Sequence, residues 1–242
     1  MPKRLYGSSN NKVNSPQWLQ NGSHESVVLD CEYEFAEKDN YFVVKWFLDN
    51  DPEPIYQWIP EFGSRHFTYR LQGRVNLEYS IFQSNELTRY RAINIINPTT
   101  DLSGTYTCNV LSRSGEDLWK KKMTVYAPPK EFTFTLTYES KDNIRLLCET
   151  KGVFPDHERK LYKITSTEKL QDLEVDKVYI YSQDPYNGYN VTVVKSLKAN
   201  KLSRREPTIF ECILTLSGTK FTKERRLFHY PGLFFSGGQQ LL

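Results

Sequence analysis

Apolar and polar residues alternate in short stretches along the whole chain. In residues 26–34, Val27, Leu29, Cys31 and Tyr33 fall on one side of the alternation. Side chains of a β-strand point to its two faces in turn, so a period of two predicts a strand with one buried face. The same pattern predicts strands over residues 44–48, 55–59, 74–79, 90–96, 105–111, 119–126, 132–138 and 144–148. The chain is therefore predicted to be all-β.

Turn-forming residues and prolines divide these strands into two groups. Residues 127–130, Ala-Pro-Pro-Lys, predict a short stiff linker, because consecutive prolines hold the backbone extended. Residues 1–22 are polar and predict a loose tail, with at most an edge strand near Val13. Residues 112–117 contain Ser, Gly and charged residues and predict a loop between two strands. A chain of 242 residues has room for two sandwich domains of about 100 residues each.

One stretch combines a sharp turn with an alternating strand that ends on a cysteine. In Asp101-Leu-Ser-Gly-Thr-Tyr-Thr-Cys108, Tyr106 lies two residues before Cys108 and shares its face. Upstream, Cys31 and Trp46 complete the order Cys, Trp, Tyr-x-Cys, which resembles the immunoglobulin superfamily. The resemblance implies a Cys31–Cys108 disulfide in a core with Trp46 and Tyr106. Tyr106 is then the corner tyrosine of such a sandwich, in the arrangement called a tyrosine corner. The long spacing between the cysteines indicates a variable-type domain.

The acidic residue before this turn departs from the family pattern. Variable-type domains carry it six residues before the cysteine, whereas that place holds Leu102 and the acid is Asp101. The departure calls into question the usual salt bridge to an arginine at the start of the strand predicted at 74–79, here Arg74.

The second group of strands resembles a constant-type domain. Residues 148–155, Cys-Glu-Thr-Lys-Gly-Val-Phe-Pro, resemble the Cys-x-x-x-Gly-Phe-x-Pro run of that class, and Cys212 is the implied disulfide partner of Cys148. Tyr162 stands about where the core tryptophan is expected, and Phe210 replaces the corner tyrosine. The predicted fold is two tandem immunoglobulin-like β-sandwiches, with a tail at 1–22, a variable-type domain at 23–126, the linker at 127–130, a constant-type domain at 131–231 and a tail at 232–242.

Cysteine usage predicts an extracellular protein. Four cysteines without a C-x-x-C pair suit two disulfides rather than a zinc or redox site, and disulfides persist in oxidising compartments. Asn21 and Asn190 begin sequons and are predicted glycosylation sites. No apolar run has the length of a signal peptide or a membrane span. We therefore expect an incomplete ectodomain, secreted or held at the cell surface by a part not visible here.

Charge and motifs argue against several function classes. The chain has 32 basic and 29 acidic residues and a pI near 8.5, too mild a charge for a nucleic-acid partner. The four histidines have no metal-ligand spacing, and no nucleophile elbow, phosphate loop or dinucleotide fingerprint occurs. We expect no enzymatic activity, no metal and no cofactor.

Apolar residues opposite the predicted core are the candidates for partner binding. If Trp46 and Cys108 point inward, their neighbours on the two strands point outward. Residues 55–59 expose either Tyr56 and Trp58 or Ile55, Gln57 and Ile59. An uncovered apolar patch of this kind marks a binding surface. The predicted partner-binding residues are Lys45, Phe47, Tyr56, Trp58, Asn109, Leu111 and Trp119. The alternative is that Tyr56 or Trp58 folds over the sheet edge or that the second domain covers them.

Two motifs narrow the resemblance. Val43-Val-Lys-Trp-Phe47, followed by Pro54-Ile-Tyr-Gln-Trp-Ile-Pro60, together with the Tyr-x-Cys ending, resembles the insect Beaten path family of neuronal surface proteins. That resemblance implies axon guidance and binding of another immunoglobulin-superfamily receptor, of the Sidestep type, by packing of two variable-type sheets. Self-association through the same sheet is an alternative. A further alternative is a secreted immune effector that contacts anionic glycans through the basic residues 120–122 and 225–226.

Overall fold

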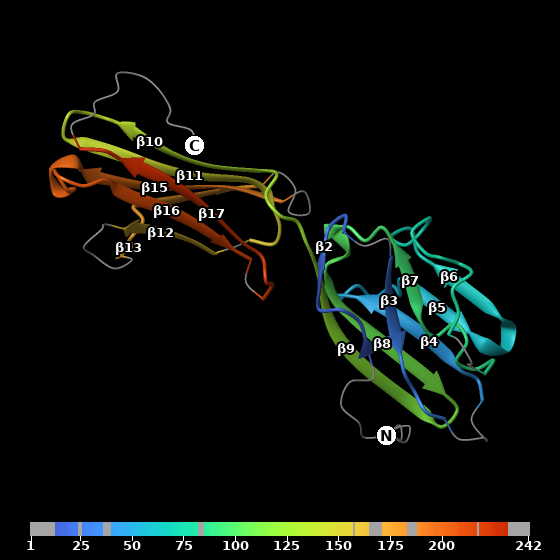
Figure 1. Cartoon of the computed structure of the whole chain (residues 1–242). Helices are drawn as coiled ribbons and strands as arrows, with labels where there is room; N and C mark the ends of the chain where they lie inside the picture. Colours follow the sequence, from blue (N-terminus) through green and yellow to red (C-terminus); the bar gives the residue numbers. More distant parts are fainter. Residues whose placement is uncertain are drawn as a thin grey trace. The chain divides into compact units, whose positions relative to one another are not determined.

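The computed structural model describes residues 13–23, 26–35, 40–81, 85–156, 158–164, 171–182, 188–216 and 218–231. Within them the regular structure is β-strand, with short 3₁₀ turns η1 (Pro60–Phe62), η2 (Thr100–Leu102) and η4 (Ala199–Lys201). The chain divides into two compact units, Met1–Tyr126 and Ala127–Leu242 (Figure 1).

The first unit is a sandwich of two sheets. One has the order β1-β3-β7, with β1 (Val13–Asn14), β3 (Ser26–Cys31) and β7 (Ile93–Ile96). The other has the order β2-β9-β8-β4-β5-β6, with β2 (Trp18–Gln20), β4 (Val43–Leu48), β5 (Tyr56–Ile59), β6 (Ser64–Phe67), β8 (Gly104–Ser112) and β9 (Gly115–Tyr126). A disulfide between Cys31 and Cys108 joins β3 to β8 and so links the two sheets.

Alternation along the strands selects the residues between the sheets. Every second residue of β3 and of β4 is buried, among them Leu29, Cys31, Val44 and Trp46. Trp46 lies opposite Cys108 in the register and belongs with the disulfide to one buried cluster. Truncating a buried aromatic residue of this size to alanine typically costs about 3–5 kcal/mol.

The turn before β8 contains the predicted tyrosine corner. The Tyr106 hydroxyl donates a hydrogen bond of 2.7 Å to the carbonyl oxygen of Leu102. Burial raises the pKa of Tyr106, so the hydroxyl keeps its proton and can donate. Leu102 is itself buried within η2 and anchors the turn to the core.

The salt bridge that the sequence called into question is present. Arg74 Nη1 lies 2.7 Å from Asp101 Oδ2, so the pair forms although the acid is one residue earlier than in the family pattern. The 3₁₀ turn η2 buries Leu102 and leaves Asp101 at the surface, where its carboxylate meets the guanidinium. Burial opposes ionisation of Asp101, but hydrogen bonds from Arg74 and Thr99 lower its pKa overall. A half-exposed pair of this kind contributes about 0–1 kcal/mol.

Within the predicted N-terminal tail, residues 1–22, the edge strand expected near Val13 is present, and a second strand, β2, was not predicted. Residues 13–14 pair with β3, and β2 pairs in parallel with β9. Leu19 is buried in the core of the sandwich. Strand β2 was missed because only one of its three side chains, that of Leu19, is buried in an otherwise polar segment.

Other boundaries in the first unit also differ from the prediction. Residues 74–79 form no strand and make only an isolated bridge, Val75 with Ile95. The strand predicted at 90–96 begins at Ile93, and β6 lies in a segment predicted as a connection. The predicted loop at 112–117 is a tight hairpin, since Ser112 pairs with Gly115.

The second unit is a sandwich of two four-stranded sheets. One has the order β10-β11-β15-β14, with β10 (Glu131–Tyr138), β11 (Asn143–Val153), β14 (Lys177–Tyr181) and β15 (Tyr189–Lys198). The other has the order β13-β12-β16-β17, with β12 (Glu158–Ile164), β13 (Gln171–Leu173), β16 (Thr208–Thr215) and β17 (Thr222–His229). A disulfide between Cys148 and Cys212 joins β11 to β16 and so links the sheets.

The core position predicted for Tyr162 belongs to its neighbour. Leu161 lies opposite Cys212, as Trp46 lies opposite Cys108 in the first unit, and it is fully buried. Tyr162 is only half-buried and lies on the other face of β12, opposite Glu211. The prediction was therefore one residue late, and one residue moves a side chain to the opposite face of a strand. Phe210 is buried, as a replacement for the corner tyrosine should be.

The residues predicted as a short stiff linker, 127–130, form backbone hydrogen bonds with the second unit. Ala127 and Phe154 exchange backbone hydrogen bonds of 2.9 and 3.0 Å, and the Lys130 amide donates to the Lys151 carbonyl oxygen at 2.9 Å. Pro128 and Pro129, between Ala127 and Lys130, have no backbone N–H and so leave no donor unpaired in this segment. The predicted C-terminal tail, 232–242, lies outside the described residues.

We expect both units to depend on their disulfides. The loops they close span 77 and 64 residues, and for such lengths the chain-entropy estimate is about 4 kcal/mol each. That is close to the whole net stability of a small domain. Reduction, verified by titration of all four thiols, should therefore lower the unfolding temperature of both units. Unchanged unfolding curves after full reduction would contradict this.

Candidate partner-binding face

The solvent side of the six-stranded sheet carries the residues predicted to bind a partner. We call this surface the outer face; it comprises Val43, Lys45, Phe47, Gln57, Ile59, Asn109, Leu111, Glu116 and Leu118. Register brings its members together from four strands. Lys45 lies opposite both Asn109 on β8 and Gln57 on β5, and Val43 lies opposite Leu111. On β9, Leu118 and Glu116 lie opposite Asn109 and Leu111.

Four of the predicted residues lie on this face. Lys45, Phe47, Asn109 and Leu111 are half-buried on it, which is the orientation expected from alternation with Trp46 and Cys108. Their neighbours keep the surface mixed in character: Leu118 is 52% exposed, and Asn109 Nδ2 donates to Glu116 Oε1 at 2.7 Å.

The prediction is wrong for Tyr56, Trp58 and Trp119. Tyr56 and Trp58 are each 1% exposed, so neither side chain is available to a partner. Trp119 lies opposite Cys108 in the register and packs, half-buried, against the core cluster. The outward positions of β5 belong to Gln57 and Ile59, while Ile55, just before the strand, is buried.

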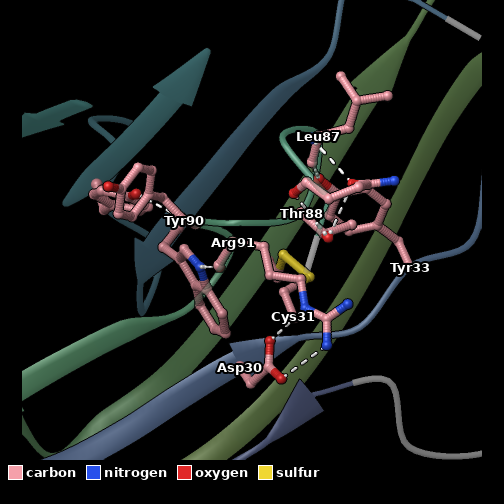
Figure 2. Close-up of polar contacts among 11 residues, drawn as sticks. Asp30, Cys31, Tyr33, Leu87, Thr88, Tyr90 and Arg91 are labelled. Carbon is pink, nitrogen blue, oxygen red and sulfur yellow. Dashed lines mark hydrogen bonds and ion pairs between the residues drawn. A yellow bond between two sulfur atoms is a disulfide. The ribbon is translucent and has the colours of Figure 1, made fainter. Parts of the chain in front are cut away.

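Hydrogen bonding explains why the large rings of β4 and β5 face inward. The Tyr56 hydroxyl donates to the Tyr90 carbonyl oxygen at 2.6 Å, and Trp46 Nε1 donates to the Arg91 carbonyl oxygen at 3.0 Å. The Tyr33 hydroxyl donates to the carbonyl oxygen of Leu87 (Figure 2). Three buried rings thus satisfy carbonyls of one irregular segment, residues 87–91, which we call the tethered segment.

An ion pair holds the same segment from the other side. Arg91 Nε and Nη2 lie 2.8 and 3.0 Å from the two carboxylate oxygens of Asp30 on β3 (Figure 2). Burial raises the pKa of Tyr56 and Tyr33 well above the ordinary value of a phenol, so both remain donors. Trp58 then packs edge-on against Tyr90, at 6.0 Å between ring centroids.

Two exposed aromatic residues at one end of the outer face were missed by the sequence reasoning. Tyr41, just before β4, is 69% exposed, and Phe62, in η1 after β5, is 82% exposed. Because β4 and β5 are antiparallel, the start of one meets the end of the other, and the Phe42 amide donates to Glu61 Oε1 at 2.9 Å. The signal that the sequence offered for their exposure was a turn-forming neighbour, Asn40 before Tyr41 and Gly63 after Phe62.

Tyr41 and Phe62 lie two and three residues along the chain from Val43 and Ile59, which are apolar residues of the outer face. Val43 pairs with Leu111, and Ile59 ends β5 on the same side of the sheet. The β8–β9 hairpin reaches the same end, since the Arg113 amide donates to the Asn40 carbonyl oxygen at 3.0 Å. We call this region, with Tyr41 and Phe62, the loop end of the outer face.

Tyr41 has a strained backbone. Its φ of 58° lies in the left-handed region, which a bulky side chain adopts at a cost of about 1–2 kcal/mol. Backbone strain of this kind concentrates at binding and catalytic sites. The neighbouring Phe42–Glu61 hydrogen bond helps to hold the conformation.

The basic residues considered for anionic glycans differ in the faces and the partners of their side chains. Lys120 and Lys122 point to one face of the sheet, and Lys121, which lies between them on β9, points to the other. Arg226 Nε lies 2.6 Å from Glu211 Oε1, and Arg225 Nε donates to the Phe132 carbonyl oxygen at 3.2 Å. Within the described residues, no group of His, Cys, Asp or Glu side chains is placed to hold a metal ion, and no helix is long and apolar enough to cross a membrane.

Comparison with known proteins supports the immunoglobulin resemblance. Residues 19–121 match the immunoglobulin domain family. No curated protein matches the sequence. Bovine butyrophilin is a similar solved structure, with a TM-score of 0.66 and 12% identity over 90% of this chain and 95% of that chain.

Two further structures are similar. The extracellular portion of mouse CD200RLa has a TM-score of 0.50 and 16% identity, over 86% of this chain and 95% of that chain. Rst D1-D2 has a TM-score of 0.52 and 15% identity, over 90% and 98%. At these identities the likeness shows the fold, and it confirms two tandem immunoglobulin-like sandwiches.

The core position of Tyr56 generates a test. Tyr56→Phe leaves the Tyr90 carbonyl oxygen without its donor and should cost about 1–2 kcal/mol in the free energy of unfolding, measured by chemical denaturation. Tyr41→Phe makes the same chemical change at an exposed ring and should stay within about 0.5 kcal/mol of the parent. Equal effects at the two positions would contradict the assignment.

The strain at Tyr41 generates a second test. Tyr41→Ala and Tyr41→Gly both remove the ring, but only glycine adopts a φ of 58° freely. We expect the glycine variant to be more stable than the alanine variant by about 1 kcal/mol. An alanine variant as stable as the glycine variant would show that the backbone there is not strained.

Proposed function

We propose that this chain, whose first unit is a domain of the immunoglobulin superfamily, is an extracellular recognition protein. It binds another cell-surface protein of the same superfamily through the outer face of the first unit, without a chemical step or a cofactor. The observation that carries the proposal is the loop end, where two exposed aromatic residues lie just beyond the strand ends that carry Val43, Ile59 and Leu111. Aromatic anchors beside half-buried apolar residues are typical of the energetic centre of an interface.

The polar part of the outer face supports partner selection. Lys45 and Glu116 lie on either side of Asn109, so the surface offers both signs of charge within a few residues. Complementary charges at the rim of an interface select partners and speed association more than they add affinity. Asn109 Oδ1 is buried and accepts no hydrogen bond within the described part of the chain.

Extracellular placement is part of the proposal. Two disulfides that each link two sheets require an oxidising compartment to form and persist. The similarity to the extracellular portion of mouse CD200RLa supports the same location.

The Beaten path resemblance supplies the first partner to test, a Sidestep-type receptor, with axon guidance as the setting. Its two motifs cover β4 and β5 and include Trp46, Tyr56 and Trp58. All three rings are buried, so the aromatic residues of these motifs contribute to the core. The partner is therefore to be identified by experiments on the exposed residues of the outer face.

A matched pair of double variants tests the proposal. Tyr41→Ala with Phe62→Ala removes both rings of the loop end, whereas Tyr69→Ala with Leu77→Ala removes two side chains, 76% and 53% exposed, that lie after β6 and outside the outer face. A multimerised ectodomain is screened against cell-surface immunoglobulin proteins, with Sidestep-type receptors included, and against itself. For the partner found, the loop-end variant should lose at least about tenfold in affinity, and the control should bind like the parent.

Other outcomes of the same screen are informative. Undiminished binding by a folded loop-end variant would refute the proposed site. Binding that falls steeply at raised salt and is lost on changing Lys120 and Lys122 would favour a glycan-binding effector. Self-association through the outer face would show the homophilic alternative.

A further inference from the structure

Strand β14 leaves an unusual amount of apolar surface uncovered. It lies at the edge of its sheet, and all five of its residues are exposed. Tyr179 and Tyr181 are 53% and 57% exposed. An apolar edge strand offers unpaired backbone groups and side chains to a second chain, and proteins normally cover or charge such edges. Apart from Lys177 at its start, β14 carries no charge.

The neighbouring strand carries a predicted modification site in register with these tyrosines. Asn190 on β15 lies directly opposite Tyr181, and Thr192 lies directly opposite Tyr179. Asn190, Val191 and Thr192 form the sequon. Val191 points into the core, so Asn190, Thr192 and both tyrosines share the outer side of the sheet. Residues directly opposite have Cβ atoms about 4.5–5.5 Å apart.

The side-chain amide of Asn190 is exposed and held in one orientation. Its Oδ1 accepts a hydrogen bond of 3.0 Å from the Gly152 amide on the adjacent strand β11. Nδ2, the atom to which a glycan is joined, is therefore on the other side of the planar amide. A glycosylated asparagine keeps its carbonyl oxygen, so this hydrogen bond survives the modification.

We propose that Asn190 carries an N-linked glycan whose first sugar rings pack on Tyr181 and Tyr179 and cover the outer side of β14. The donor is a lipid-diphosphate-linked oligosaccharide, transferred by the exporting cell. Nδ2 forms a bond to C1 of the first N-acetylglucosamine, the bond from C1 to the diphosphate oxygen breaks, Nδ2 loses one proton, and the lipid diphosphate leaves. The inference rests on export of the chain but not on its partner binding.

Sugar and tyrosine rings are chemically suited to each other in this arrangement. The C–H groups on one side of a pyranose form an apolar face, and a tyrosine ring offers a large flat apolar surface with a polar tip. Two such rings in a row along β14 match the first two sugars of the chain. The second sequon has no such surroundings, since Asn21 lies in the turn after β2 instead of within a paired strand.

A double-mutant cycle on the full chain, secreted from eukaryotic cells, tests the proposal. Thr192→Val abolishes the sequon and leaves the Asn190 amide in place, and Tyr181→Ala removes the ring that faces the sugar. Peptide mass mapping should find the glycan on Asn190 in the parent and none in Thr192→Val. Tyr181→Ala should lower the unfolding temperature about 2–4 °C more in the glycosylated parent than in the Thr192→Val background, if the contact has the strength of an aromatic pair.

Controls separate this contact from general effects. Asn190→Gln should reproduce the Thr192→Val background, and Asn21→Gln should leave the effect of Tyr181→Ala unchanged. Loss of the glycan should also increase self-association in sedimentation, because the edge is uncovered. An unmodified Asn190 in the secreted protein overturns the proposal. So does a glycan on Asn190 with the same Tyr181→Ala effect in both backgrounds.

Discussion

The first unit depends on hydrogen bonds from the polar groups of its buried aromatic side chains to backbone carbonyl oxygens. Tyr33, Trp46 and Tyr56 bring two hydroxyls and an indole N–H into a core that excludes water, and each unpaired donor there would cost about 1–3 kcal/mol. The tethered segment supplies three carbonyl oxygens, and the Arg91–Asp30 pair fixes that segment to β3. An irregular stretch of chain is thus as necessary to this core as the disulfide beside it.

This constraint also decides which surface remains for recognition. Because the rings of Tyr56 and Trp58 turn inward, the outer face is left with Lys45, Asn109 and Gln57, the half-buried ring of Phe47 and apolar residues of medium size. The large exposed rings lie instead at the loop end, on residues just outside the strands, where the outer face meets Tyr41 and Phe62. The buried rings that stabilise this unit are therefore distinct from the exposed rings of Tyr41 and Phe62, and the two sets can be changed separately.

The second unit is also a sandwich of two sheets, but the residues at two of its key core positions are less polar than those of the first unit. Leu161 replaces the tryptophan opposite the cysteine and Phe210 replaces the corner tyrosine, so neither position brings a polar tip that needs an acceptor. Its aromatic residues lie partly at the surface, most clearly on β14. In the first unit the comparable problem of exposed edges is reduced by β2, which pairs with β9 and buries Leu19.

The sequence by itself determined the strands with clear alternation, both disulfides, the tyrosine corner of Tyr106 and the outward direction of Lys45, Phe47, Asn109 and Leu111. These depend on local period and on a cysteine pattern with few solutions. Only the tertiary structure decided the face of Tyr56 and Trp58, since the acceptor of Tyr56 lies 34 residues away in a segment without periodicity. The same holds for the Arg74–Asp101 pair and for the Phe42–Glu61 hydrogen bond, which joins the segments that carry Tyr41 and Phe62. Such contacts join residues distant in sequence, and alternation along one strand carries no information about what stands opposite.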